Sequence, residues 1–157
     1  MKILFIEDHP YKLNQVLSFL KDHFSEAVVE VRNSYNSGLK ELVLHNTEYD
    51  LLLLDISMPN YDISSEESGG EFIPLAGKLI LKEMYLREIP TKAIVVTMHG
   101  NFEDGTKLSE LDENLRNEFS DNYVGHVYFT VVNSDWKSQL SSLIKKHSND
   151  SNSHRRR

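Results

Sequence analysis

Apolar residues along the chain follow two patterns, short continuous runs and longer stretches with helical spacing. Continuous runs of strand length lie at residues 2–6, 27–31, 49–55, 92–97 and 125–132. Runs of this kind suit strands that are buried on both faces of a sheet. Stretches in which apolar residues recur every three or four positions, as on one face of a helix, lie at 11–24, 35–43, 77–87, 108–119 and 136–144. The chain is therefore predicted to alternate five strands with five helices.

This alternation predicts the class of fold and the place of a site. Strands that alternate with helices form a parallel sheet with helices on both faces, the doubly wound α/β arrangement. Ligands of such sheets bind at the carboxyl ends of the strands, where the strand order reverses. Residues that directly follow a strand are therefore the first candidates for a functional site.

Composition narrows the classes of function. The 157 residues predict one domain, and the absence of cysteine excludes disulfides and thiolate metal sites. A net charge of −7 argues against sequence-independent binding of nucleic acid, which needs lysine and arginine to neutralise phosphates. No apolar run has the length of a membrane span, and the N-terminus shows no signal-peptide cleavage site. We expect a cytoplasmic protein without a membrane or nucleic-acid partner.

Two segments interrupt the regular pattern. Residues 61–76 are rich in serine, glutamate and glycine and show no periodicity, so we expect a loop there. Residues 148–157 resemble a disordered tail, which leaves residues 1–147 as the folded domain. Ser109 and Asp112, at the start of the fourth helical stretch, resemble a capping box.

The strand ends carry a group of acidic residues. Glu7 and Asp8 follow the first strand, Asp55 follows the third, and Thr97 ends the fourth. Carboxylates that converge at one edge of a sheet repel each other, and a divalent cation among them removes the repulsion. A site with oxygen ligands alone favours Mg²⁺. An aspartate in such a site can also act as a nucleophile toward phosphorus.

Three motifs, "ILFIEDHP", "LLLLDISMP" and "IVVT", carry a family resemblance. In this order and at strand ends, they resemble the receiver domain of bacterial two-component response regulators. The resemblance implies a flavodoxin-like fold in which Asp55 accepts a phosphoryl group and the Thr97 hydroxyl moves toward it. It also implies that Mg²⁺ is held by Asp8, Asp55 and the backbone carbonyl of Ser57, with Glu7 assisting through a water molecule.

The chain departs from the family at three places. The segment at 61–76 and a second segment at about 99–122 are longer than in typical receivers. The family also has a glycine soon after the Met-Pro pair, a role that Gly69, Gly70 or Gly77 can fill. A lysine that contacts the phosphoryl group ends the fifth strand in the family, and here Asn133 stands at that position. Because asparagine carries no charge, we expect a small conformational response to phosphorylation.

These observations predict a stand-alone phosphoacceptor for signalling, not an enzyme that turns over a substrate. The resemblance implies phosphoryl transfer from a sensor histidine kinase or a phosphotransfer protein, and output through contacts with an unknown downstream protein. One alternative is a pseudo-receiver that binds proteins without being phosphorylated. Another is a phosphatase with an aspartate nucleophile, but that chemistry needs a second aspartate at the position of Ser57.

Overall fold

The computed structural model describes residues 1–64, 68–102 and 104–155, and from residue 148 onward it describes the backbone only. Its main sheet has five strands: β1 (Lys2–Ile6), β2 (Val28–Arg32), β3 (Leu51–Leu54), β6 (Lys92–Thr97) and β7 (Tyr123–Tyr128). All pairings are parallel, and the order across the sheet is β2-β1-β3-β6-β7. This is the flavodoxin-like order, so the predicted fold class is confirmed.

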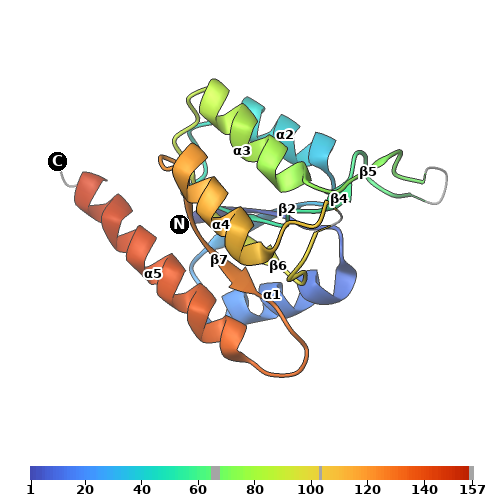
Figure 1. Ribbon diagram of the computed structural model, residues 1–157. Coiled ribbons are helices and arrows are strands. Elements are labelled where there is room, and N and C mark those ends of the chain that lie inside the picture. The colour runs from blue at the N-terminus through green and yellow to red at the C-terminus, as the bar shows by residue number, and fades with distance from the viewer. Residues whose placement is uncertain (65–67, 103, 156–157) are drawn as a thin grey trace.

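Five helices cover the two faces of this sheet: α1 (Pro10–His23), α2 (Tyr35–Leu44), α3 (Ala76–Leu86), α4 (Leu108–Glu118) and α5 (Asp135–Arg155). Figure 1 shows α2, α3 and α4 on one face and α1 and α5 on the other. Two apolar cores result because alternate residues of each strand point to opposite faces. In β3, Leu52 and Leu54 enter the core beneath α2, α3 and α4, while Leu51 and Leu53 enter the core beneath α1 and α5.

The strand order determines where the edge of the sheet can hold a ligand. From β1 the chain crosses to β2 on one side and then returns to β3 on the other side of β1. The crossover connections after β1 and β3 therefore leave in opposite directions, and a crevice opens between the carboxyl ends of these two strands. The residues after Ile6 and after Leu54 lie at this crevice.

The last strand of the sheet is shorter than predicted. The apolar pattern extends to Val132, whereas β7 begins at Tyr123 and ends at Tyr128. β7 is an edge strand that pairs only with β6, and β6 ends at Thr97. The Phe129 amide still donates to the carbonyl of Thr97 at 2.8 Å, but Val131 and Val132, which lie past the end of β6, are exposed.

The long segment after β3 has structure that its composition does not predict. Two short antiparallel strands, β4 (Met58–Pro59) and β5 (Phe72–Ile73), form a separate two-stranded sheet. A backbone hydrogen bond of 2.9 Å from Asn60 to Glu71 extends the pairing. Ile73 and Leu75 pack against the main core, whereas Phe72 is half exposed. Backbone pairing between distant residues, which needs no local periodicity, forms this structure on either side of residues 65–67.

Two further predictions concern helix ends. The capping box at Ser109 is wrong, because α4 begins after Lys107 and has no side-chain cap. The Asp112 carboxylate instead accepts hydrogen bonds from Arg116, Tyr123 and His126. The backbone of α5 is helical to Arg155, but side chains from residue 148 onward and residues 156–157 lie outside the description, so disorder of the tail stays a prediction.

Within the described residues, none of the helices is long and apolar enough to cross a lipid bilayer.

Candidate functional site at the carboxyl edge of the sheet

Three carboxylates meet at the crevice between β1 and β3. One oxygen each from Glu7, Asp8 and Asp55 lies within 4.8 Å of the others. Glu7 and Asp55 are buried, and Asp8 is half buried. The structure therefore brings together the acidic residues that the sequence placed at neighbouring strand ends.

Backbone hydrogen bonds hold Glu7 and Asp55 in this position. The Glu7 amide donates to the carbonyl of Arg32 at 2.9 Å, which continues the pairing of β1 with β2. The Asp55 amide donates to the carbonyl of Ile6 at 3.1 Å, which continues the pairing of β3 with β1. Both residues are thus extensions of strands, and the parallel register of β1 and β3 aligns them.

Each carboxylate also accepts a hydrogen bond from the loop that follows it. Glu7 Oε1 accepts from the amide of His9 at 3.0 Å, and Asp55 Oδ1 accepts from the amide of Ile56 at 2.7 Å. These bonds leave Glu7 Oε2 and Asp55 Oδ2 for other partners in the crevice.

Burial makes the negative charges of this cluster costly. Desolvation, and secondly the Asp55 charge, raise the pKa of Glu7 to about 8, although Lys12 opposes the shift. Desolvation followed by repulsion from Asp55 also raises the pKa of Asp8 above its ordinary value of 3.8. Burial and the Asp55 charge therefore oppose the ionised form of Glu7 more strongly than Lys12 supports it.

A lysine that the sequence analysis did not select enters this cluster from α1. Lys12 is 1% exposed, and its Nζ lies 2.6 Å from Glu7 Oε2 and 3.0 Å from Asp55 Oδ2. Nζ also donates to the carbonyl of Val96 at 2.9 Å. The contact with Glu7 has the distance of an ion pair but not the alignment of a hydrogen bond, and Oε2 accepts none within the described part of the chain.

The sequence does carry a signal for this lysine. Lys12 lies four residues before Val16 and eight before Leu20, so it continues the stripe that α1 buries. A charged residue in line with a buried stripe is either paired or exposed at the end of the helix. Because α1 starts directly after the acidic pair, this pattern indicates that Lys12 pairs with the carboxylates.

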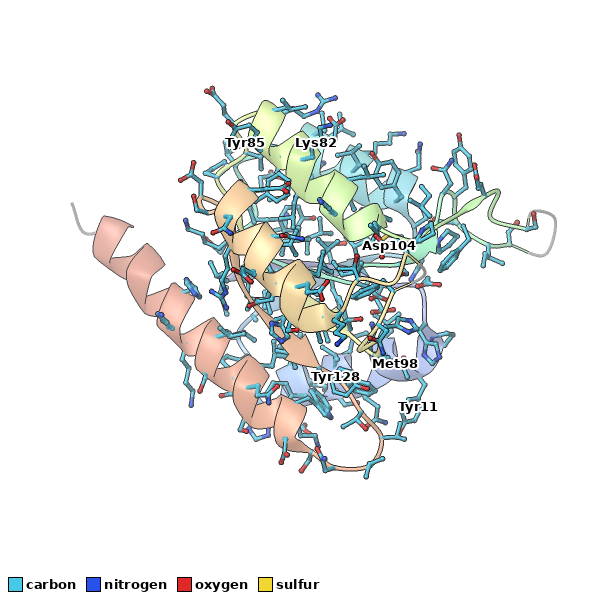
Figure 2. The ribbon with its side chains drawn as sticks, viewed as in Figure 1. Tyr11, Lys82, Tyr85, Met98, Asp104 and Tyr128 are labelled. Atoms are coloured by element: carbon cyan, nitrogen blue, oxygen red, sulfur yellow. The ribbon has the colours of Figure 1, made fainter. Side chains whose placement is uncertain are left out.

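Thr97 and Ser57 also lie at this edge. Thr97 is fully buried at the end of β6, the strand next to β3, and its hydroxyl accepts a hydrogen bond from the amide of His99 at 3.1 Å. The Ser57 hydroxyl donates to the carbonyl of Pro74 at 2.5 Å, which ties the loop after Asp55 to the start of α3. In Figure 2, Met98, which follows Thr97, and Tyr11, at the start of α1, lie toward the same end of the molecule.

The structure distinguishes among the three glycines that follow the Met-Pro pair. Gly69 and Gly70 have positive φ angles of 91° and 69° in the segment between β4 and β5. Gly77, in the first turn of α3, packs against Asp55 itself. A β-carbon on Gly77 would lie 2.6 Å from the Asp55 carbonyl oxygen and 3.0 Å from the α-carbon of Ile56. Gly77 is therefore the glycine that lets α3 approach the site.

Asn133, the residue at the position of the family lysine, interacts with its own loop and not with the acidic cluster. It is exposed in the loop before α5, and its Oδ1 accepts a hydrogen bond from the amide of Asp135 at 3.1 Å. Thr130 likewise accepts from the amide of Val132 at 3.2 Å. The nearest lysine in sequence, Lys137, places its Nζ over the ring of Trp136, 5.7 Å from the ring centroid. The end of β7 supplies turn residues in place of the family lysine.

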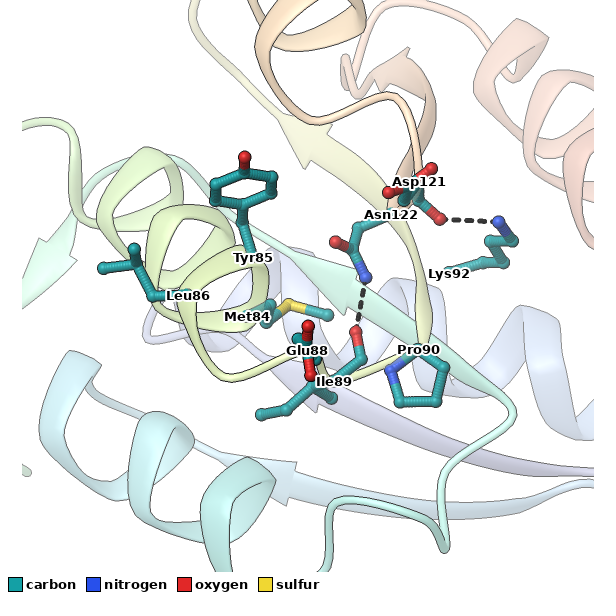
Figure 3. A pocket seen from close by; sticks show the side chains of 9 residues that line it. All are labelled: Met84, Tyr85, Leu86, Glu88, Ile89, Pro90, Lys92, Asp121 and Asn122. Carbon is teal, nitrogen blue, oxygen red and sulfur yellow. Dashed lines mark hydrogen bonds between the residues drawn. The ribbon is translucent and has the colours of Figure 1, made fainter.

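A separate hollow lies at the other edge of the sheet. Figure 3 shows its lining, which includes Met84 and Tyr85 at the end of α3 and Asn122 before β7. Asn122 donates to the carbonyls of Ile89 and Thr91 at 2.7 and 3.0 Å. These bonds join the amino ends of β6 and β7, so the hollow is distant from the acidic cluster along the strands.

Comparisons with known proteins find relatives in sequence and neighbours in structure. No family model matches the chain. The protein y4jR of Sinorhizobium fredii, described as uncharacterized, is 30% identical over 148 residues, which cover 90% of this chain and 95% of y4jR. The Detocs response regulatory protein DtcB of Enterobacter cloacae is 28% identical over 148 residues, which cover 92% of this chain and 98% of DtcB.

Solved structures share the fold at lower identity. A response regulator receiver domain protein from Clostridium thermocellum has a TM-score of 0.65 at 20% identity, with 96% of each chain covered. The receiver domain of an HD domain-containing protein from Pseudomonas fluorescens has a TM-score of 0.66 at 14% identity, with 97% of each chain covered. The chain belongs to the receiver domains of response regulators.

Proposed function

We propose that this receiver domain accepts a phosphoryl group on Asp55. The observation that carries the proposal is the convergence of Glu7, Asp8 and Asp55 at the crevice between β1 and β3. Asp55 directly follows the central strand β3. Its amide donates to the Ile6 carbonyl and its Oδ1 accepts from the Ile56 amide, and these two bonds orient the carboxylate. One relative, DtcB of Enterobacter cloacae, is by its description a response regulatory protein.

The reaction requires a nucleophilic oxygen and neutralisation of charge. An oxygen of Asp55 forms a bond to phosphorus while the bond from phosphorus to the donor, a phosphohistidine nitrogen in our proposal, breaks. The electron pair of that bond remains on the donor nitrogen, which takes up a proton from solvent. Phosphoryl transfer depends mainly on positioning of the reacting groups and on electrostatic stabilisation. The preformed carboxylate cluster positions the nucleophilic oxygen.

The residues of the cluster fit a divalent cation. Glu7 Oε2 is a buried carboxylate oxygen that accepts no hydrogen bond within the described residues, and all three acidic groups offer hard oxygen ligands. We propose that Asp8, Asp55 and the Ser57 carbonyl would hold Mg²⁺, with Glu7 assisting through water. When bound, Mg²⁺ neutralises negative charge on the transferring phosphoryl group. Thr97, buried at the end of β6, is the proposed switch hydroxyl.

Partners follow from the same proposal. A sensor histidine kinase or a phosphotransfer protein is the proposed donor, and a downstream protein is the proposed recipient of the signal. The exposed Val131 and Val132 before α5 and the half-exposed Phe72 of β5 show that apolar side chains are available on the surface near this edge.

Replacing Asp55 tests the proposal. Incubation of the unmodified protein with acetyl phosphate and Mg²⁺ should add one phosphoryl group, detected by intact mass. Asp55→Asn should take up none, because an amide is not a competent acceptor. Asp62→Asn, on the exposed segment after β4, is the matched control and should be phosphorylated like the unmodified protein. Equal labelling of Asp55→Asn and the unmodified protein would show that Asp55 is not the acceptor.

The contact of Lys12 with Asp55 favours a second candidate function. A buried ammonium between Glu7 and Asp55 neutralises part of the cluster without a metal ion. In a pseudo-receiver this ion pair would be permanent, and the domain would bind its partner without phosphorylation. Absence of labelling in the unmodified protein, together with no response to Mg²⁺, is the result that this second function requires.

A further inference from the structure

Lys12 has a buried position that helix formation does not explain. Its ammonium contacts groups at the ends of three neighbouring strands: Glu7 after β1, Asp55 after β3 and Val96 in β6. It lies in the first turn of α1, where the helix dipole disfavours a positive charge. A fully buried ammonium is also strongly desolvated and is kept only where it is paired. The position of Lys12 is therefore determined by the acidic site.

Lys12 contacts the oxygen of Asp55 that is available for the proposed reaction, and neither Lys137 nor Asn133 does so in this structure. Asp55 Oδ1 is occupied by the amide of Ile56, whereas Oδ2 is in contact with Lys12 Nζ at 3.0 Å. A phosphoryl group on Asp55 would add negative charge directly beside this ammonium. Lys137, the lysine nearest to the end of β7 in sequence, is directed at Trp136, and the Asn133 side chain accepts a hydrogen bond within its own turn.

We propose that Lys12 supplies, from helix α1, the fixed positive charge that pairs with the phosphoryl group on Asp55. This inference rests on the proposed phosphoacceptor function of Asp55. It assigns to a helix residue the role that receiver domains give to a lysine at the end of their fifth strand. The positive charge that the family places at the position of Asn133 is then supplied by Lys12 and is not lost.

The new location changes which elements respond to phosphorylation. Lys12 is bonded to the carbonyl of Val96, whose neighbour is Thr97. When a phosphoryl group attracts the ammonium, its contacts with Glu7 and with the Val96 carbonyl weaken. The response therefore passes from α1 to the end of β6, and the loop after β7 is not required.

Charge-removing variants of Lys12 test this inference with beryllofluoride as the phosphoryl mimic. Lys12→Met keeps the length of the side chain and removes its charge, and Lys12→Arg keeps the charge. Because Lys12→Met leaves Glu7 unpaired, the double variant Lys12→Met with Glu7→Gln serves as a second test in a folded protein. Lys21→Met, exposed on the same helix, is the matched control.

The readouts are the affinity for beryllofluoride with Mg²⁺ and the backbone amide NMR shifts of Val96 and Thr97. We expect at least about a tenfold loss of mimic affinity in Lys12→Met, since a charge-assisted contact is removed. The double variant should show the same loss and lose the shifts at Val96 and Thr97, Lys12→Arg should recover part of the affinity, and Lys21→Met should match the unmodified protein.

Each contrary result has a distinct meaning. If both Lys12→Met and the double variant bind the mimic as tightly as the unmodified protein, Lys12 is only a structural ion-pair partner and the inference is wrong. If Lys12→Met binds Mg²⁺ and the unmodified protein does not, the ammonium stands in place of the metal, which also overturns the inference. If the unmodified protein binds no mimic and takes up no phosphoryl group, the proposed function fails, and the inference fails with it.

Discussion

At the scale of single residues, the site depends on close approaches that exclude larger side chains. Gly77 shows this most clearly, because its missing β-carbon leaves room for the backbone of Asp55 and Ile56. The Gly77 amide also donates to the Ile56 carbonyl at 2.8 Å, so α3 begins in direct contact with the loop after β3. The position of the Asp55 backbone therefore depends on a residue 22 positions later in the chain.

Gly77→Ala should destabilise the protein despite its place in a helix. Alanine in an open helix position is favoured over glycine by about 1 kcal/mol. Here the added methyl would meet backbone atoms that have no alternative rotamer, and overpacking of this kind costs about 1–3 kcal/mol. We expect a net loss of up to about 2 kcal/mol in the free energy of unfolding, measured by urea denaturation.

Gly100→Ala is the control for this prediction. A β-carbon on Gly100 would meet nothing within 4 Å, so its effect should stay within about 0.5 kcal/mol. A gain of stability in Gly77→Ala would mean that α3 moves away from Asp55 without cost.

At the scale of elements, α4 is attached to β7 by a polar network beside the core. Asp112 on α4 accepts hydrogen bonds from Tyr123, from His126 Nδ1 at 2.9 Å and from Arg116 at 3.1 Å. Burial acts to raise the pKa of Asp112, but these hydrogen bonds outweigh it and hold the pKa below the ordinary value of 3.8. The ionised form of Asp112 is therefore the form that binds α4 to β7.

This shift predicts how the stability of the α4–β7 contact depends on pH. A carboxyl with a lowered pKa in the folded state contributes stability above its unfolded pKa, and it loses that contribution as the pH falls through the folded pKa. At pH 5, Asp112→Asn should lower the free energy of unfolding by roughly 1.5 kcal/mol, the low end for hydrogen bonds to a charged group. The difference between the two proteins should shrink below about pH 4.

Denaturation series from pH 5 to pH 2.5 measure this difference. Glu113→Gln, exposed on the same helix, is the control for loss of one negative charge. A difference that stays constant down to pH 2.5 would show that the network does not depend on ionised Asp112.

At the scale of the whole molecule, the two apolar cores carry a site that is electrostatically unfavourable by itself. The raised pKa values of Glu7 and Asp8 report this cost, since burial and repulsion from Asp55 oppose their ionised forms. A cation that binds only the folded protein stabilises it in proportion to the logarithm of its concentration above Kd. The proposed metal site therefore links the chemistry at one edge to the stability of the whole domain.

Addition of Mg²⁺ should raise the melting temperature. At 100 times Kd the stabilisation is about 2.7 kcal/mol, which corresponds to about 5–10 °C for a domain of this size. Asp8→Asn should lose most of this increase, because it removes a proposed ligand. Glu26→Gln, at an exposed turn, should keep it. A melting temperature that does not change with Mg²⁺ in the unmodified protein would contradict the metal site.

The sequence by itself determined the class of fold and the position of the acidic residues. Local periodicity distinguishes strands from helices, and their alternation predicts a parallel sheet covered on both faces. The flavodoxin-like strand order was implied by the resemblance to receiver domains. Glu7, Asp8 and Asp55 could be predicted as a cluster because each directly follows a strand, and strand ends in a parallel sheet share an edge. Thr97 was selected by the same reasoning and lies at that edge, in the strand next to β3.

Only the tertiary structure decided the contacts that depend on distant pairing. The length of β7 is limited by the end of β6, and β4 pairs with β5 across a segment without periodicity. Lys12 continues the buried stripe of α1 in the sequence, but only the packing of α1 against the sheet places its ammonium beside Asp55, 43 positions away. Local patterns record which face of an element is buried, whereas the partner of a buried charge is determined by which elements pack together.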